Sequence, residues 1–295
     1  IMYHSVSSLD LPGVTGSKPI SLEKFKSHIH ALRKAGFELT SMRDLNSRNS
    51  TKRRAFITSD DGTVDWGLNV LPWCEKHGIP THTSVLSGAD RAKPKYPNVH
   101  LVQEILGSKS KTVLDKLLQQ IEAYLSETDK KFINQVYDYE QDNSLRLIKG
   151  ALNFILPENS VSDIIKSVLS PKDFDNLKGR FLNIDDYRNF SFATIGNHTE
   201  SHRLFDGSVL KYYSQEIFPC GEYLKDHPNF VSGVFTLPSK PKLGANKKKL
   251  YSYLKAVGYM HCLTSFAGCW DGQSFEVPRI DAKELEVTLE FSQNG

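Results

Sequence analysis

The chain contains 295 residues, a length that fits either one large α/β barrel or two average domains. Hydrophobic residues make up 39% and charged residues 24%, which is the composition of a globular protein with a sizeable core rather than a disordered chain. The net charge of +3 gives no reason to expect nucleic acid, and no apolar run approaches the ~18 residues of a membrane-spanning helix.

The N-terminal part of the chain alternates between strand and helix patterns. Residues 1–6 predict a short strand that contains His4. Ser21 is a candidate N-cap for a helix with apolar residues on one face, and Gly36 stands where a glycine would stop that helix. This order of elements indicates α/β architecture.

The alternation continues through a polar segment. Residues 55–57 predict a strand that runs into Thr58-Ser59-Asp60-Asp61-Gly62. A helix ending near Gly78 follows, and then a strand that contains residues 84–86. The polar segment is therefore expected at the carboxyl end of a strand.

Residues 102–187 have a different character. Apolar residues recur at helical spacing and strand patterns almost vanish, so we expect a helical insertion whose apolar stripes are packing faces. Strand patterns return at residues 192–195, 231–236 and 260–264, with a helix over residues 246–257. The pattern predicts one barrel with a helical block inserted into one of its loops.

The cysteines and the start of the chain bear on the compartment. Four cysteines without CxxC or zinc-ribbon spacing predict buried free thiols: Cys74, Cys220, Cys262 and Cys269. No signal peptide is present, which favours the cytoplasm, although the chain starts at Ile1, as it would after removal of an N-terminal segment. The sequence does not indicate an oligomeric state.

Two segments carry residues suited to chemistry, and each follows a predicted strand. The first is Asp60-Asp61, and the second is His198-Thr199-Glu200-Ser201-His202. Catalytic groups of α/β barrels lie at the carboxyl ends of the strands. Two histidines at i and i+4 with one carboxylate leave an open position on a metal ion, and a second carboxylate can take a proton from water.

These segments resemble the motifs of polysaccharide deacetylases of the NodB-homology class, carbohydrate esterase family 4. Thr58-Ser59-Asp60-Asp61-Gly62 is similar to the first motif, T-F-D-D-G, and residues 198–202 match the second, H-[ST]-x-x-H. The segment over residues 22–45 and the strand after Gly78 also resemble the surroundings of the first motif. The resemblance skips the helical block.

The resemblance implies one catalytic domain over residues 1–295, a distorted (β/α) barrel of about seven strands with the insertion at 102–187. It implies hydrolysis of the N-acetyl amide of an amino sugar, in a polysaccharide or a glycan precursor, by metal-activated water. Asp60 would be the base. Asp61, His198 and His202 would bind a divalent metal, zinc by the resemblance, with cobalt, nickel and manganese as alternatives.

The general acid needs a different source, because no histidine follows Leu285. Ile1-Met2-Tyr3-His4 resembles the family's C-terminal Leu-x-x-His motif moved to the front, as in circularly permuted poly-N-acetylglucosamine deacetylases. His4 is therefore the candidate acid, and a hydrogen-bonded core histidine is the alternative. Arg279 and Asp281 resemble a late family segment that orients such a histidine, or they form an ordinary surface ion pair.

Three positions depart from the family pattern. Ser59 replaces a phenylalanine, and His82 stands in place of a threonine, which we interpret as structural. The third motif retains Pro238, a candidate second-shell or substrate-binding residue, but lacks its usual arginine. Because that arginine normally braces the base, we expect either another partner for Asp60 or low activity.

Three other functions remain open. The same metal site would serve a deformylase or deacetylase of a lipid-linked sugar, and a catalytically silent carbohydrate-binding relative would explain the missing arginine. A two-histidine, one-carboxylate iron oxygenase shares the ligand set. Its usual ligand order differs from the one here, and it has no need for the second aspartate.

Overall fold

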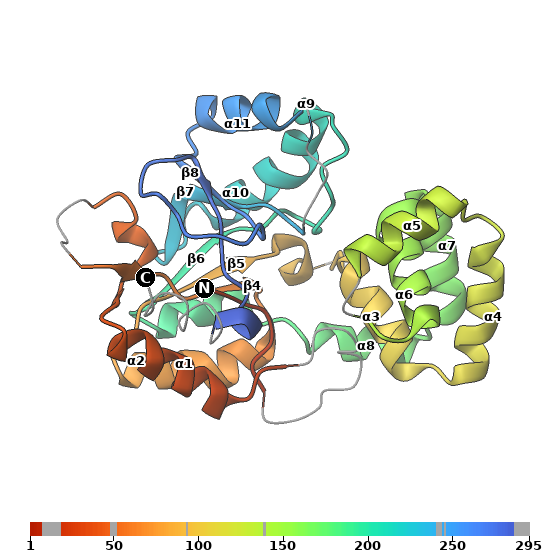
Figure 1. The fold of residues 1–295 in the computed structure, drawn as a ribbon, viewed down its shortest axis with the longest axis horizontal. Coiled ribbons are helices and arrows are strands. Elements are labelled where there is room, and N and C mark those ends of the chain that lie inside the picture. The colour runs from red at the N-terminus through yellow and green to blue at the C-terminus, as the bar shows by residue number, and fades with distance from the viewer. Residues whose placement is uncertain are drawn as a thin grey trace. The chain divides into compact units, whose positions relative to one another are not determined.

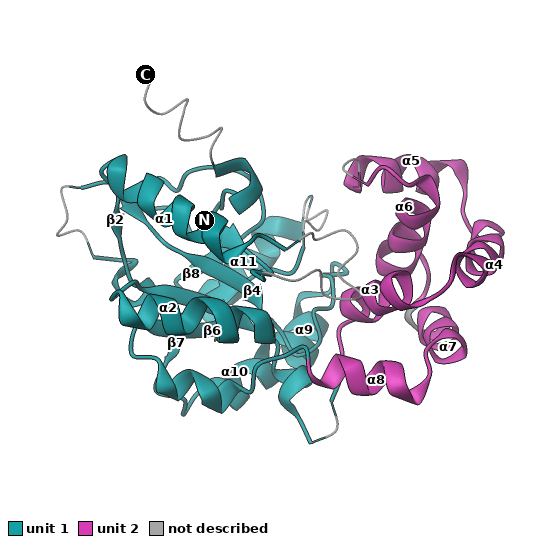
Figure 2. Ribbon diagram, turned by 90° about the horizontal axis from the view of Figure 1, so that it is seen from below, with its two compact units in different colours: residues 1–8, 19–95, 180–295 teal, residues 9–18, 96–179 magenta. Residues whose placement is uncertain are grey.

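The structure is a computed structural model that describes residues 1–7, 19–47, 52–92, 94–137, 140–239, 244 and 246–285. The chain divides into two compact units, which Figure 2 shows in different colours. The first contains residues 1–8, 19–95 and 180–295, and the second contains residues 9–18 and 96–179. Along the chain, the larger segment of the second unit interrupts the first.

A seven-stranded parallel sheet forms the centre of the first unit (Figure 1). Its strands, in spatial order, are β1 (Met2–Tyr3), β4 (Thr58–Asp61), β5 (Thr81–Val85), β6 (Ala193–Asn197), β7 (Phe230–Thr236), β8 (His261–Leu263) and β9 (Glu276–Val277). A parallel bridge between Met2 and Asp281 brings the segment after β9 back to β1. The sheet confirms the distorted (β/α) barrel predicted from the sequence.

Of the residues 55–57 expected to form a strand, only Ala55 does so. Residues Arg54–Ala55 form β3, which pairs with β2 (Glu38–Leu39) in a separate two-stranded sheet, and β4 begins only at Thr58. Asp60 and Asp61 are therefore the last two residues of β4. All four residues of β4 are buried although all are polar, so the strand carries no apolar pattern that could reveal it.

Helices of the first unit surround this sheet. They are α1 (Leu22–Lys34), α2 (Leu71–Lys76), α9 (Val209–Tyr212), α10 (Phe218–Leu224) and α11 (Asn246–Ala256). In α1 the Ser21 hydroxyl accepts the backbone N–H of Lys24 at 3.1 Å, and the apolar face is buried. Gly36 beyond its end has a left-handed φ of 81°. The predicted N-cap and stop signal are confirmed.

Two helices of the first unit contain a π-helical turn next to a proline. The turn η2 (Trp66–Val70) precedes Leu71-Pro72, and η6 (Tyr213–Ile217) precedes Phe218-Pro219. A proline inside a helix lacks the N–H for the i→i−4 bond, and its ring meets the carbonyl one turn earlier. A widened turn at that place accommodates both effects. The helical run over residues 209–224 was not predicted, because Pro219 normally signals a helix boundary.

The described part of the second unit is helical and has its own apolar core. Its helices are α3 (Asn98–Ser108), α4 (Lys111–Glu122), α5 (Glu127–Val136), α6 (Asn143–Gly150), α7 (Glu158–Val168) and α8 (Pro171–Lys178). They begin before residue 102 and end before residue 187. Tyr187 instead packs in the core of the first unit. No described helix of either unit is long and apolar enough to cross a membrane.

Candidate active site

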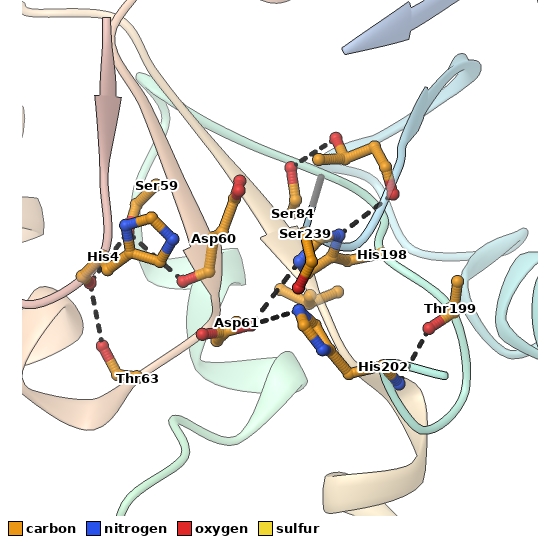
Figure 3. A network of polar contacts seen from close by, with 12 residues as sticks. His4, Ser59, Asp60, Asp61, Thr63, Ser84, His198, Thr199, His202 and Ser239 are labelled. Carbon is orange, nitrogen blue, oxygen red and sulfur yellow. Dashed lines mark hydrogen bonds and ion pairs between the residues drawn. The ribbon is translucent and has the colours of Figure 1, made fainter. Parts of the chain in front are cut away.

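Three potential metal ligands meet at the carboxyl end of the sheet (Figure 3). Asp61 ends β4, and His198 and His202 follow β6. An Asp61 carboxylate oxygen lies 3.5 Å from Nε2 of His198 and 3.7 Å from Nε2 of His202. One donor atom from each residue lies within 4.8 Å of the other two. Segments far apart in the sequence thus supply two imidazoles and one carboxylate to one point.

The chemistry of this donor set fits a divalent metal ion. Nδ1 of His198 lies 3.0 Å from the carbonyl oxygen of Thr236, so this nitrogen is the one that carries and donates a proton. Nε2 is then left with its lone pair on the side of Asp61. Ligand atoms of a tetrahedral zinc site are about 3.3–3.4 Å apart when the bonds are about 2.0–2.1 Å. The two measured separations are close to that value, and three ligands leave a fourth position free.

Left-handed backbone is concentrated at this end of the sheet. Among the described residues, four that are not glycine have a positive φ: Asp61 (72°), Thr199 (79°), His202 (58°) and Ser239 (57°). Such conformations cost about 1–3 kcal/mol each and persist where surrounding contacts enforce them. The N–H of Thr199 donates to Oδ1 of Asn197, and Oγ1 of Thr199 accepts the N–H of His202, each at 2.9 Å. The loop between the two histidines is held by its own hydrogen bonds.

Asp60 is buried and paired with Arg279. Nη1 and Nη2 of Arg279 donate to the two carboxylate oxygens of Asp60, each at 2.7 Å, and the side chains are 6% and 3% exposed. Burial alone would raise the pKa of Asp60. The positive charge of Arg279 and its hydrogen bonds outweigh burial and hold that pKa well below its usual range. Asp60 is therefore a carboxylate.

Arg279 is itself fixed by the barrel interior. Its Nε donates to the carbonyl oxygen of Thr264 at 3.0 Å, and Nη1 donates to Oγ1 of Thr58 at 3.2 Å. The bridge between Met2 and Asp281 explains how a residue after β9 reaches β4, because β1 lies next to β4. Arg279 supplies the brace that the third motif lacks. The alternative of a surface ion pair with Asp281 is wrong, since Arg279 is only 4% exposed.

His4 lies at the same end of the sheet as Asp60. In the pairing of β1 with β4, Tyr3 is opposite Ser59, so His4 follows at the level of Asp60. The carbonyl oxygen of His4 accepts the hydroxyls of Ser59 (3.2 Å) and Thr63 (3.3 Å). Figure 3 shows the imidazole of His4 next to the carboxylate of Asp60. His4 is half-buried.

Asp281, Pro238 and His82 occupy other places. Oδ1 of Asp281 accepts the N–H of Lys283 at 2.9 Å and caps a short 3₁₀ helix, while Pro238 is buried just after β7. His82 is buried in β5, with Nδ1 3.0 Å from Oγ1 of Thr194. Three of the expected buried thiols are confirmed, and the exception, Cys269, is exposed.

Sequence reasoning missed two acidic residues, one within the histidine loop and one beside it. Glu200 and Glu216 are both buried. Glu200, within the loop, accepts the hydroxyl of Ser87, and Glu216 accepts the hydroxyl of Ser201. Glu200 was seen only as the variable position of the second motif. Glu216 lies in the helical run that was not predicted, and no pattern in the sequence links it to the histidines.

Solved deacetylases share this fold. IcaB from Ammonifex degensii matches 99% of this chain over 95% of its own length, with a TM-score of 0.57 and 14% identity. A de-N-acetylase from Aggregatibacter actinomycetemcomitans gives 0.54, 13% identity and 98% coverage of both chains. The Streptococcus pyogenes deacetylase PplD, solved in complex with acetate, has a TM-score of 0.53 and 13% identity, and the match covers 98% of this chain and 96% of PplD. No family model and no curated protein matches the sequence. The chain has the fold of polysaccharide deacetylases.

Proposed function

We propose that the protein is a metal-dependent deacetylase that hydrolyses the N-acetyl amide of an amino sugar in a polysaccharide or a glycan precursor. The observation that carries this proposal is the ionised Asp60, braced by Arg279, beside the donor set of Asp61, His198 and His202. A buried carboxylate next to a potential metal site is suited to accept a proton from an attacking water. The shared fold with solved deacetylases supports the same reaction.

Asp61, His198 and His202 would hold the divalent ion, with zinc preferred and cobalt, nickel or manganese as alternatives. When bound, this ion would supply Lewis-acid polarisation of the scissile carbonyl. The proton on Nδ1 of His198 is fixed by the Thr236 carbonyl, so Nε2 is available as a ligand. The carboxylate of Asp61 adds a negative charge that partly balances a dication.

The residues of the chain divide the proton transfers. Asp60 accepts a proton from the water whose oxygen adds to the carbonyl carbon. Arg279 orients both oxygens of Asp60 and keeps the carboxylate ionised. His4, from the strand beside β4, donates a proton to the amide nitrogen as the C–N bond breaks. Acetate and a free amine are the products. Asp281 and Pro238 would shape the backbone near the site. Asp281 caps the 3₁₀ helix after β9, and Pro238 lies in the turn after β7.

We propose that residues 1–295 are a single catalytic domain and that the second unit is an insertion within it. A deformylase or deacetylase of a lipid-linked sugar is the alternative activity, since the same donor set and base would serve it. The pairing of Asp60 with Arg279 weakens the case for a catalytically silent carbohydrate-binding relative, which rested on the missing arginine.

Acetate release from N-acetylglucosamine oligomers tests the proposal. The zinc-loaded protein is expected to release acetate, and Asp60→Asn is expected to keep its zinc while turnover falls about 10²–10⁴-fold. Formate release from N-formylated sugars would favour the alternative substrate. Zinc binding without release of either acid from a panel of N-acylated glycans would contradict both hydrolases and favour the binding protein.

A further inference from the structure

The loop that carries His202 is fastened to a glutamate from another segment. Glu216 lies in η6, and it is only 4% exposed. Its Oε2 accepts the backbone N–H of Ser201 at 2.9 Å, and its Oε1 accepts the hydroxyl of Ser201 at 2.7 Å. Both oxygens of this buried carboxylate are therefore used on the residue immediately before His202.

Backbone bonds join the same segments independently of the Glu216 side chain. The N–H of Glu200 donates to the carbonyl oxygen of Glu216 at 2.9 Å. On the other side, the carbonyl oxygen of Glu200 accepts the N–H of Gly88 at 2.8 Å, and its carboxylate accepts Nη2 of Arg91 at 3.1 Å. These contacts remain when Glu216 is replaced, so the chain around the loop should still fold.

The local helix geometry places Glu216 inside the π turn that precedes Pro219. A π turn holds more residues than an α turn, so it changes which side chains face the sheet, and such turns are frequent at functional sites. Here Glu216 and Ile217 within the turn are buried, while the neighbouring Gln215 is exposed. The widened turn thus brings a carboxylate to the loop.

The bonds of Glu216 act where the backbone is strained. His202 has a left-handed φ of 58°, and Nε2 of its ring lies 3.7 Å from Asp61. Glu216 fixes the peptide between Glu200 and Ser201 through the N–H of Ser201, and it holds the Ser201 side chain through the hydroxyl, directly before this conformation. The N–H of His202 itself is bonded to Oγ1 of Thr199. A backbone this strained persists only while its surroundings hold it.

We propose that Glu216 is a positioning residue that keeps His202 in its metal-binding conformation, an inference that rests on the ligand role given to His202 in the proposed function. Glu216 is not one of the proposed metal ligands. It acts through Ser201, whose two donors would otherwise have to find other partners. Replacing Glu216 should therefore weaken metal binding more than it weakens the fold.

Metal binding by the full chain tests this inference, with Zn²⁺ and Co²⁺ as probes. Glu216→Ala is expected to weaken Zn²⁺ binding about 10–100-fold, the range for residues that orient ligands. The visible absorption of the Co²⁺ complex should change as well. Ser201→Ala removes only the hydroxyl bond and should give a smaller loss in the same direction. The matched control is Glu222→Ala in α10, an exposed glutamate paired with Lys225 at 2.8 Å, which should bind like the wild type.

The outcomes separate this inference from the proposed function. Wild-type affinity and an unchanged Co²⁺ spectrum in Glu216→Ala would overturn it. If that variant does not fold, Ser201→Ala and Glu216→Gln decide, and unchanged affinity in both would overturn it. A wild-type protein that binds neither ion would count against the proposed function. Crystal structures of wild type and Glu216→Ala would then decide, since a His202 that keeps its left-handed backbone without Glu216 overturns the positioning role.

Discussion

Arg279 and Asp60 form a buried ion pair with two hydrogen bonds of 2.7 Å each, although they lie 219 positions apart in the sequence. The pair joins the segment after β9 to the end of β4. Its geometry uses the planar fork of the guanidinium, which matches both oxygens of a carboxylate. A lysine would supply the charge without this match.

Arg279→Met should lower the free energy of unfolding by about 3–5 kcal/mol, because it leaves the buried Asp60 carboxylate without its partner. Urea denaturation measures this loss. Asp60→Asn in the same chain should recover part of the stability, since it removes the uncompensated charge. If the losses of the two single variants simply add in the double variant, the pair is not coupled.

His4→Ala should slow acetate release from an N-acetylated sugar about 10²–10⁴-fold and leave zinc content unchanged. This loss is expected because the leaving amine must gain a proton as the C–N bond breaks. An acetyl ester of a nitrophenol needs no such proton, so its hydrolysis should be affected much less. His30→Ala replaces an exposed histidine of α1 and serves as the control. Equal losses on both substrates would argue against His4 as the acid.

Much of the fold was predictable from local patterns. Ser21, the apolar face of α1 and Gly36 each carry a signal that depends only on neighbouring residues, and the structure agrees with them. The strand β4 was misplaced because all four of its residues are polar, so they show no apolar pattern typical of a buried strand. The helical run over residues 209–224 was missed because it contains Pro219, which local rules read as a helix end, whereas the π turn before this proline lets the helix continue.

The site was predictable only where its chemistry is written in short motifs. The sequence could place Asp61 beside His198 and His202 through a family resemblance, and the structure brings them together. The partner of Asp60 depends on the contact between β1 and the segment at Asp281, which no local pattern contains. The bond between Glu216 and Ser201 also joins two separate segments, so no local pattern near Glu216 indicates it.

His82 should make stability depend on pH. Burial, with a contribution from the charge of Arg279, lowers its pKa from 6.5 to about 3 in the folded protein. Below pH 6.5 the unfolded chain therefore binds a proton that the folded protein refuses, so stability is full above pH 6.5 and falls toward pH 3. The slope from this group is about 1.4 kcal/mol per pH unit. Urea denaturation between pH 7 and pH 5 should show a steeper loss for the wild type than for His82→Gln, and parallel curves would contradict the assignment.

Gly196 and His82 should be energetically coupled. A Cβ added at Gly196 would lie 2.5 Å from Nε2 and 2.7 Å from Cε1 of the His82 ring, which is buried and hydrogen-bonded to Thr194. Gly196→Ala should therefore lower the free energy of unfolding by about 1–3 kcal/mol through overpacking.

His82→Ala removes the ring that the new methyl group would meet. In the double variant, the added cost of Gly196→Ala should largely disappear. The loss of unfolding free energy in the double variant should therefore be smaller than the sum of the losses in the two single variants. Gly221→Ala in α10 is the control, since its Cβ would meet only ordinary contacts, the nearest at 3.5 Å, and it should be neutral or slightly stabilising. Strict additivity between positions 196 and 82 would mean that β6 shifts to accept the methyl group. Because His198 comes directly after this strand, such a shift would also weaken zinc binding, which a Zn²⁺ titration of Gly196→Ala would detect.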